Sequence, residues 1–284
     1  MDAIAPDRDL TGSQSVDRAL SLLMLVGRQA ERGISLAETV DESGFNKPTA
    51  RRLLLALMRA GLVEQDEETR RYYVGEVAYV LGSFASRRYG LLQLSMESLV
   101  RISKKTEDSS FLSVRRDIFS VCLHREEGTF PIRTHALQAG FEHPLGVGAG
   151  SLAMLAALPD DEVASVLEHN AAILRERYPK LQPERLLADV ALTRANGYAL
   201  NPGLVYANSW GIGVVVRFAD GKPAGAISIA AIDSRMQSPR EQELAAILRE
   251  EAARVEGKLV DMFAEKGRIR DAAPIRPSTR RSSR

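Results

Sequence analysis

The segment that decides the fold reads SLAETVDESGFNKPTARRLLLALMRAGLVE and occupies residues 35–64. Its first four residues match a capping box, because Ser35 can accept from the amide three residues on while Glu38 reaches back. Gly44 permits the left-handed turn that ends a short helix. The Asn-Lys-Pro run at residues 46–48 then begins another helix, with proline in its first turn. Two helices joined by a short glycine-containing turn are typical of a helix-turn-helix.

Elements on both sides of this segment predict a winged helix-turn-helix over residues 15–75. Upstream, apolar residues spaced by three and four predict a helix that begins near Ser15. The apolar positions that follow this spacing are Val16, Ala19, Leu20, Leu23 and Val26. Downstream, residues 62–64 and 71–74 alternate like strands around an acidic turn and predict a two-stranded wing. Residues 1–14 are expected to form a disordered tail.

Positive charge is concentrated on the third predicted helix. Residues 43–63 contain four basic side chains and no acid, whereas residues 1–75 as a whole contain 10 basic and 12 acidic residues. The motif would place this helix in a major groove, where arginine suits guanine and the helix N-terminus suits a phosphate. The alternative is a protein-interaction scaffold with a solvated basic face. The expected DNA-binding residues are Lys47, Pro48, Thr49, Arg51, Arg52, Arg70 and Arg71.

These motifs resemble those of the IclR family of bacterial transcriptional regulators, and the resemblance covers roughly residues 15–264. It rests on residues 44–54, 61–64 and 71–75, and further on GAGSLAMLA at 148–156, GYA at 197–199 and AISIA at 226–230. The resemblance implies a winged helix-turn-helix joined by a helix to a GAF-like effector-binding domain, with dimers or tetramers on palindromic operators. Family members usually carry Ser or Thr in place of Pro48 and His or Tyr in place of Arg51. We therefore expect a different operator and the same fold.

The remainder of the chain predicts a linker helix and an α/β domain, giving an α+β protein. Residues 76–105 have a helical pattern interrupted at Gly90, and we assign residues 76–98 to a linker helix that mediates homodimerisation, with a tetramer left open. Residues 99–264 predict two hairpins, at 110–123 and 212–232, with helices near 150–158, 160–168 and 183–196. Paired hairpins give an antiparallel sheet. Ser238 and Glu241 predict a capping box that opens a last helix to about residue 264.

A loop rich in glycine, at residues 146–151, leads directly into an apolar helix. Glycine lets backbone N–H groups approach a ligand, and a helix N-terminus favours an anion, although such a loop is also common in simple helix–sheet packing. The family resemblance implies that this loop donates amides to the carboxylate of a small effector. It also implies pocket positions at Val215 and Ser228. The expected effector-binding residues are Gly148, Ala149, Gly150, Ser151, Trp210, Val215 and Ser228.

The loop at residues 201–210 favours an apolar ligand. Many family members carry an acid there, whereas this chain has none and instead places Tyr206 and Trp210 in the loop. The missing charge and the added aromatic surface favour an effector larger than a two- or three-carbon keto acid, such as an aromatic acid.

Composition excludes several other classes of protein. Hydrophobic residues make up 45% and charged residues 26% of the chain, which is typical of a globular protein with a normal core. No apolar run reaches the ~18 residues of a membrane span, and the acidic N-terminus is no signal peptide, so a cytoplasmic protein without a membrane partner is expected. Residues 265–284 are expected to form a disordered basic tail, with seven basic residues and one acid from position 266 onward.

Catalysis and metal binding are the weakest hypotheses. A nucleophile–base pair could be assembled from Cys122, His124, His135, His143 and Ser151, but nothing in the sequence orders one. A zinc site from His124, His135 and His143 lacks the usual ligand spacing, and a single cysteine excludes a Cys-based site. We therefore expect no enzyme activity, no cofactor and no metal.

Overall fold

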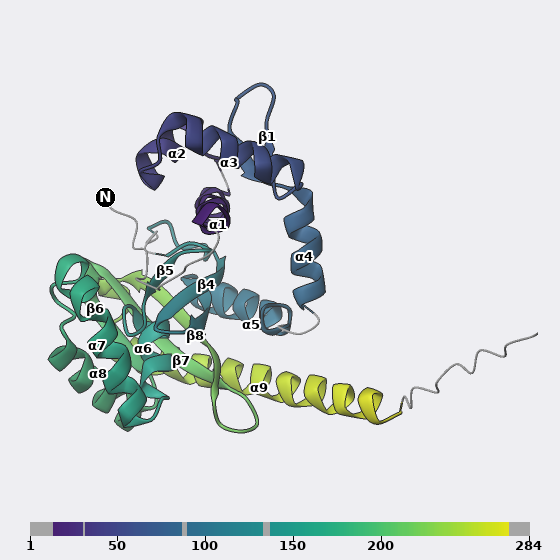
Figure 1. The fold of residues 1–284 in the computed structure, drawn as a ribbon. Coiled ribbons are helices and arrows are strands. Elements are labelled where there is room, and N and C mark those ends of the chain that lie inside the picture. Colours follow the sequence, from purple (N-terminus) through teal and green to yellow (C-terminus); the bar gives the residue numbers. More distant parts are fainter. Residues whose placement is uncertain (1–13, 31, 87–89, 133–136, 273–284) are drawn as a thin grey trace, which may run out of the picture. The chain divides into compact units, whose positions relative to one another are not determined.

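The computed structural model describes residues 14–272, except residues 31, 87–89 and 133–136, and describes no side chains from 265 onward. The chain forms two units, the first comprising residues up to Gly90 together with Ala139–Phe141 and the second comprising the rest from Leu91 onward (Figure 1). The sequence placed this boundary at residue 98. The difference arises because helix α5, Leu91–Thr106, is continuous and buries Leu99 and Ile102 in the core of the second unit.

The first unit is a winged helix-turn-helix, as predicted. It consists of α1 (Gln14–Arg28), α2 (Leu36–Ser43), α3 (Lys47–Arg59), β1 (Val63–Gln65), β2 (Tyr72–Val74) and α4 (Glu76–Ser86). The predicted capping box is present at Ser35 and Glu38, and Gly44 ends α2 with a φ of 70°. Strands β1 and β2 pair in antiparallel fashion, with Val63 opposite Val74.

The buried face of α1 overlaps only in part with the apolar positions selected by spacing. Leu22, Leu25 and Val26 enter the core with residues of α3 and the wing, whereas Val16 and Leu20 remain 52% and 49% exposed. Both sets satisfy helical spacing, because apolar residues occur on more than one side of α1. The spacing alone therefore predicted the helix and three of its core-facing residues, Ala19, Leu23 and Val26, but it also selected Val16 and Leu20, which are exposed.

The second unit is built around one antiparallel sheet with the strand order β5-β4-β3-β8-β7-β6. Its strands are β3 (Ser109–Arg116), β4 (Phe119–Glu126), β5 (Glu142–Pro144), β6 (Ala199–Tyr206), β7 (Ser209–Arg217) and β8 (Pro223–Ile232). Its helices are α5, α6 (Ala149–Ala156), α7 (Asp160–Arg177), α8 (Pro183–Asn196), the short η1 (Asp233–Arg235) and α9 (Arg240–Ala272). The two predicted hairpins correspond to β3–β4 and β7–β8, so the predicted antiparallel sheet is confirmed.

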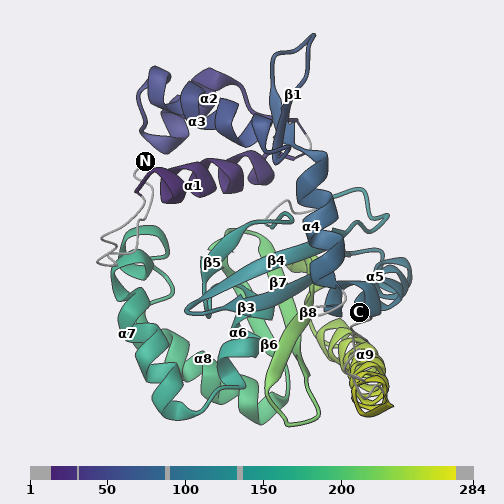
Figure 2. The ribbon, with the colours of Figure 1, turned by 45° about the vertical axis from the view of Figure 1, so that its right-hand side comes forward.

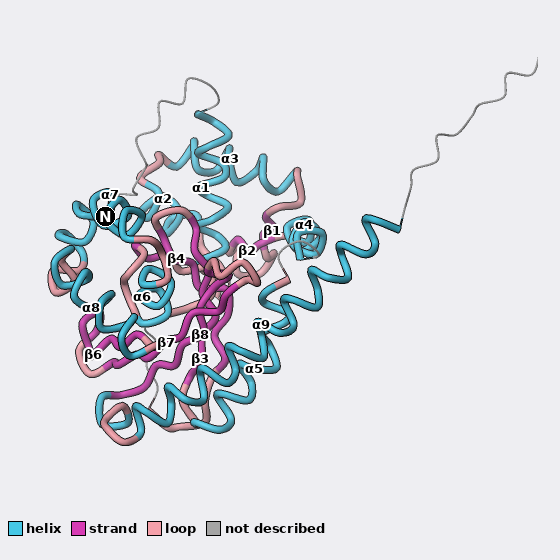
Figure 3. The backbone as a smooth tube through the Cα atoms, turned by 90° about the horizontal axis from the view of Figure 1, so that it is seen from below, coloured by secondary structure: helices cyan, strands magenta, loops and turns pink. Residues whose placement is uncertain are grey.

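Helices cover both faces of this sheet (Figures 2 and 3). Helices α5 and α9 pack on one face, against alternate residues of the strands such as Ile227 and Ile229. Helices α6, α7 and α8 form a second core on the other face, with Ala199 and Ala226. The alternation of side chains along each strand thus separates two cores, and the face under α6 also carries the pocket described below.

The last helix differs from its predicted start and end. It begins at Arg240 and continues to Ala272, beyond the predicted end at about residue 264. The Glu241 carboxylate, expected to complete a capping box, accepts a hydrogen bond from the Tyr198 hydroxyl at 2.6 Å. Among the described residues, no helix combines the length and the apolar character needed to cross a membrane.

Candidate functional site

The exposed face of α3 gathers the basic residues of the helix-turn-helix. Its opposite face buries Ala50, Leu53, Leu54 and Leu57 in the core. The exposed face lines a shallow surface depression formed by Lys47, Pro48, Arg51, Arg52, Leu55 and Arg59. None of the four basic side chains pairs with a carboxylate in the described part of the chain. The helix therefore presents four uncompensated positive charges on one side.

The N-terminus of α3 offers fewer donors than the sequence suggested. The Thr49 amide donates to the capping Asn46 Oδ1 at 2.9 Å, so it is not free to bind a phosphate. Pro48 has no N–H group to donate. What the first turn leaves for an anion is the Lys47 amide, the Lys47 ammonium group and the Thr49 hydroxyl.

Arg71, expected to contact DNA, instead joins the wing to α2. Its guanidinium donates to Glu38 Oε2 at 2.7 Å and to the carbonyl oxygens of Arg32 and Gly33. Hydrogen bonds from Ser35, followed by those from Arg71, lower the pKa of Glu38 to about 2. Arg70, beside it, stays exposed at the wing turn with a φ of 58°. The two neighbouring arginines thus have different environments, and only Arg70 is free on the surface.

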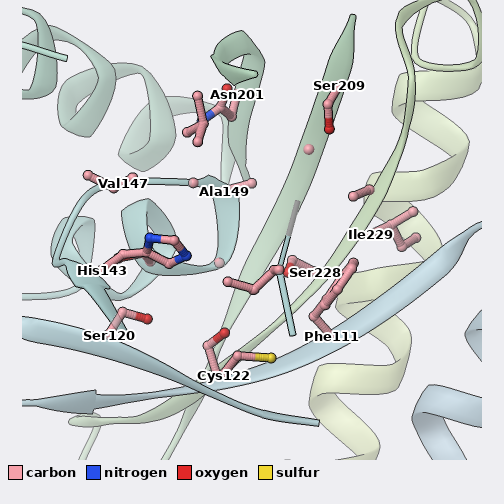
Figure 4. Close-up of a pocket in the computed structure, with 18 of the residues that line it drawn as sticks. Phe111, Ser120, Cys122, His143, Val147, Ala149, Asn201, Ser209, Ser228 and Ile229 are labelled. Carbon is pink, nitrogen blue, oxygen red and sulfur yellow. The ribbon is translucent and has the colours of Figure 1, made fainter. Parts of the chain in front are cut away.

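The second unit contains a pocket on the α6 face of its sheet (Figure 4). Its volume is about 80 Å³, several times the space that one water molecule needs. Six of the seven expected effector residues line it: Gly148, Ala149, Gly150, Ser151, Trp210 and Ser228. Val215 of β7 does not line the pocket, although it was expected to. It packs instead against the hydrophobic core formed by α6, α7 and α8.

The N-terminus of α6 provides hydrogen-bond donors at this pocket. Gly148 occupies the cap position with a φ of 82° and provides no side-chain cap. The amides of the first helical turn have no acceptor within the helix. A Cβ atom on Gly150 would lie 3.1 Å from Ser228 Oγ, which places that hydroxyl beside the helix N-terminus. The Ser151 side chain stabilises the loop that precedes α6, because its Oγ accepts a hydrogen bond from the Gly146 amide at 2.9 Å.

The aromatic end of the pocket comes from β6, β7 and the turn between them. Trp210 and Tyr206 line this end together with Val205 and Asn201. Asn201 Oδ1 accepts from the Leu204 amide at 2.9 Å and so shapes the turn. No Asp, Glu, Lys or Arg is found among the pocket-lining residues that the structure describes.

Strands β4 and β5 contribute Ser120, Cys122 and His143 to the pocket, which the sequence did not assign to a ligand site. His143 Nδ1 lies 3.1 Å from the Tyr178 hydroxyl of α7. Burial lowers the pKa of His143 to about 4, so the imidazole is neutral at pH 7. No local signal could have found these residues, because they meet only when β4 and β5 pair with Ser120 opposite His143.

Three of the candidates for a nucleophile–base pair, Cys122, His143 and Ser151, line the same pocket, but the described hydrogen bonds join no two of them. Burial raises the pKa of Cys122 to about 12, and its thiol donates to the carbonyl oxygen of His124. The His124 imidazole contacts Glu126. His135 lies outside the described residues, and those that are described contain no group of three His, Cys, Asp or Glu placed to hold an ion.

A winged helix-turn-helix with an uncompensated basic helix, followed by a domain with an internal pocket, defines the class of transcriptional regulators with an effector domain. The model of the IclR helix-turn-helix domain matches residues 15–67, and that of the bacterial transcriptional regulator IclR C-terminal domain matches residues 84–256. The chain belongs to the IclR family of transcriptional regulators.

Individual relatives agree with this assignment. The HTH-type transcriptional regulator BhcR of Paracoccus denitrificans is 27% identical over 82% of this chain and 82% of its own length. A crystal structure of an IclR transcriptional regulator from Silicibacter sp. TM1040 matches with a TM-score of 0.69 and 26% identity, covering 86% of this chain and 96% of that one. An IclR homologue from Microbacterium hydrocarbonoxydans, complexed with 4-hydroxybenzoate, has the same fold with a TM-score of 0.69 and 20% identity, covering 86% of this chain and 98% of that one.

Proposed function

We propose that the protein is a cytoplasmic regulator that binds a palindromic operator as a homodimer and responds to a small, aromatic carboxylate. The observation that carries the DNA half is the exposed face of α3, where four basic residues have no carboxylate partner within the described chain. Arginine in a major groove pairs with guanine, and the remaining basic groups suit phosphates. The proposed contacts are Lys47, Thr49, Arg51, Arg52 and Arg70.

The proposed effector site is the pocket under α6. The free amides of the α6 N-terminus and the Ser228 hydroxyl suit a carboxylate, because a helix N-terminus favours negative charge. The Trp210 and Tyr206 rings suit an apolar or aromatic body. The Microbacterium homologue was crystallised with an aromatic carboxylate, 4-hydroxybenzoate, which supports this ligand class for the present protein.

An exposed apolar stripe on α4 supports the proposed dimer. Val77, Val80, Leu81 and Phe84 recur at helical spacing, and Phe84 is 68% exposed. A contiguous apolar surface of this kind is typical of a protein–protein interface. A palindromic operator has two half-sites, so it requires two recognition helices related by a twofold axis. A symmetric dimer supplies both helices.

The DNA half is tested with the DNA upstream of the protein's own gene, in a mobility-shift titration. Arg51→Ala is expected to cost about 1–3 kcal/mol and to relax base preference, whereas Arg52→Ala weakens all sequences more evenly if it contacts phosphate. Lys222→Ala, an exposed lysine of the β7–β8 turn, is the matched control and should bind as the wild type does. Wild-type affinity in the folded Arg51→Ala/Arg52→Ala variant would favour the alternative, a protein-interaction scaffold.

The dimer is tested by analytical ultracentrifugation of the full chain. Phe84→Glu is expected to weaken association because it places a charge in the apolar stripe. Tyr79→Glu is the control, since Tyr79 is 78% exposed and lies on the other side of α4. A wild-type chain that stays monomeric at micromolar concentration contradicts the proposed dimer.

A further inference from the structure

One end of the pocket, at β4 and β5, contains two polar groups that form no hydrogen bond within the described chain, the Ser120 hydroxyl and Nε2 of His143. Ser120 and His143 lie directly opposite each other in the β4–β5 register, so their side chains share one face of the sheet. Ser120 is 3% exposed. Neither its hydroxyl nor Nε2 of His143 has a hydrogen-bond partner in the described chain. Both residues line the pocket, so a ligand that fills this end covers the two groups and must satisfy them, because a polar group buried without a partner is costly.

The His143 ring is held so that one edge faces the pocket. The Tyr178 hydroxyl lies at Nδ1, and the two rings meet edge to face with centroids 6.3 Å apart. Nε2 is left for the pocket, and Figure 4 shows the ring reaching into it. A neutral imidazole offers either a donor or an acceptor at Nε2, depending on its tautomer. A hydroxyl group can both donate and accept, so it satisfies either tautomer as well as the Ser120 hydroxyl.

This pair is separate from the donors proposed for the carboxylate. On β3, Phe111 lies opposite Ser228, whereas Arg115 of the same strand lies opposite Ser120. Ser120 is therefore displaced from Ser228 both along the strands and toward the β5 edge of the sheet. A second carboxylate at this end would find no cation, because the described lining residues include no Lys or Arg and His143 is neutral at pH 7.

We propose that Ser120 and His143 form a hydroxyl-recognition subsite, so that the effector is a singly charged aromatic carboxylate that also carries a hydroxyl group. The subsite rests on the proposed function of the pocket, since the carboxylate must first bind at α6. Tyr178 is a positioning residue, because it contacts the ligand only through the His143 ring. Selectivity arises because an acid without the hydroxyl leaves Ser120 and Nε2 buried and unsatisfied.

The test uses three pairs of acids that differ only in a hydroxyl group: benzoate and 4-hydroxybenzoate, phenylacetate and 4-hydroxyphenylacetate, and 3-phenylpropionate and 3-(4-hydroxyphenyl)propionate. Three lengths are needed because the two ends of the pocket lie on different strands. Each acid is titrated into the full-length protein by calorimetry. We expect the hydroxylated member of at least one pair to bind about ten-fold more tightly than its parent. Terephthalate, which has a second carboxylate, is expected to bind more weakly than benzoate.

Variants assign this preference to the subsite. Ser120→Ala removes one pocket oxygen, and His143→Phe keeps a ring of similar shape. Each should reduce the ratio within the preferred pair toward one, because the hydroxylated acid loses a partner and the parent acid no longer leaves that polar group unsatisfied. Tyr178→Phe should reduce the ratio less, since it loosens the ring without removing Nε2. Equal affinities within all three pairs, or a ratio that Ser120→Ala and His143→Phe leave unchanged, overturn the subsite alone. No binding by any of the six acids overturns the aromatic-carboxylate pocket, and the subsite with it.

Discussion

Arg71 connects the wing to the helix-turn-helix through a single side chain. It donates hydrogen bonds to the Glu38 carboxylate and to the Gly33 carbonyl oxygen. Glu38 precedes Arg71 by 33 positions in the sequence, and Gly33 precedes it by 38. We expect Arg71→Ala to lower the thermal unfolding midpoint by a few degrees, because it leaves Glu38 and two carbonyl oxygens without this donor. Arg70→Ala, at the adjacent exposed position, should leave the midpoint unchanged. Circular dichroism melts compare the two, and identical midpoints would contradict a stabilising role for Arg71.

Arg70 and Arg71 should also differ in operator binding. If Arg70 contacts a phosphate, its removal reduces the dependence of affinity on salt, because fewer counterions are released on binding. Removal of Arg71 should leave that dependence as it is in the wild type. The sequence alone treated both arginines alike, since nothing local distinguishes a guanidinium that Glu38 engages from one that is free.

His143 makes stability depend on pH. Its pKa is about 4 in the folded chain against 6.5 for the unperturbed group. Between these values the unfolded chain binds a proton that the folded chain does not, so stability is full above pH 6.5 and falls as the pH is lowered. The expected loss from this group is about 2 kcal/mol between pH 7 and pH 5.

Urea unfolding at the two pH values measures this loss, and His143→Gln isolates it. The other titrating groups are common to both proteins, so the difference between wild type and variant reports the imidazole. The variant should lose less stability on acidification than the wild type. Equal losses would show that burial of the imidazole does not alter its protonation.

At the scale of the element, replacing a helical glycine by alanine is expected to weaken ligand binding at Gly150 in α6 but not at Gly257 in α9. A Cβ atom on Gly150 in α6 would lie 3.1 Å from Ser228 Oγ, whereas one on Gly257 in α9 would meet nothing within 4 Å. Both Gly→Ala changes raise helix propensity by up to about 1 kcal/mol. Gly150→Ala should nevertheless weaken ligand binding, because its methyl group enters the space between the α6 amides and Ser228.

Gly257→Ala is the matched control and should stabilise the chain without changing ligand affinity. Calorimetry with 4-hydroxybenzoate measures binding, and urea unfolding measures stability. Unchanged affinity in Gly150→Ala would place the carboxylate away from the α6 N-terminus. Loss of affinity in Gly257→Ala would show that the two substitutions act through general stability.

Local signals predicted the elements better than they predicted the packing of those elements. The caps of α2 and α3 involve residues three positions apart, so the sequence specifies them. The buried face of α1 depends on which of several apolar stripes meets α3, and the spacing selected Val16 and Leu20 incorrectly. The expected cap at Glu241 was likewise replaced by a bond from Tyr198, 43 residues away.

The same distinction applies to the pocket. Its α6 end could be predicted because glycines and a helix start occur together in residues 146–151. Its β4–β5 end could not, because Ser120, His143 and Tyr178 become neighbours only through strand pairing and the packing of α7. The sequence therefore predicts the end proposed to bind the carboxylate but not the end proposed to bind the hydroxyl group.

At the scale of the whole molecule, the proposed DNA-binding helix α3 and the proposed effector pocket belong to different units of the chain. A ligand can regulate DNA binding only if its affinity differs between the free and the operator-bound protein. That difference is reciprocal, so a ligand that changes operator affinity by some factor has its own affinity changed by the same factor. Both factors can be measured separately on one protein.

Trp210 provides the signal for this measurement, because it is the only tryptophan in the chain and lines the pocket. We expect 4-hydroxybenzoate to change its emission saturably and to shift operator affinity by roughly 5–150-fold, with operator DNA shifting ligand affinity equally. The Arg51→Ala/Arg52→Ala variant should keep the emission change but lose its response to DNA, and Gly150→Ala should keep operator binding but lose its response to the acid. If the acid saturates Trp210 and operator affinity stays constant, the pocket binds a ligand but does not regulate the reader.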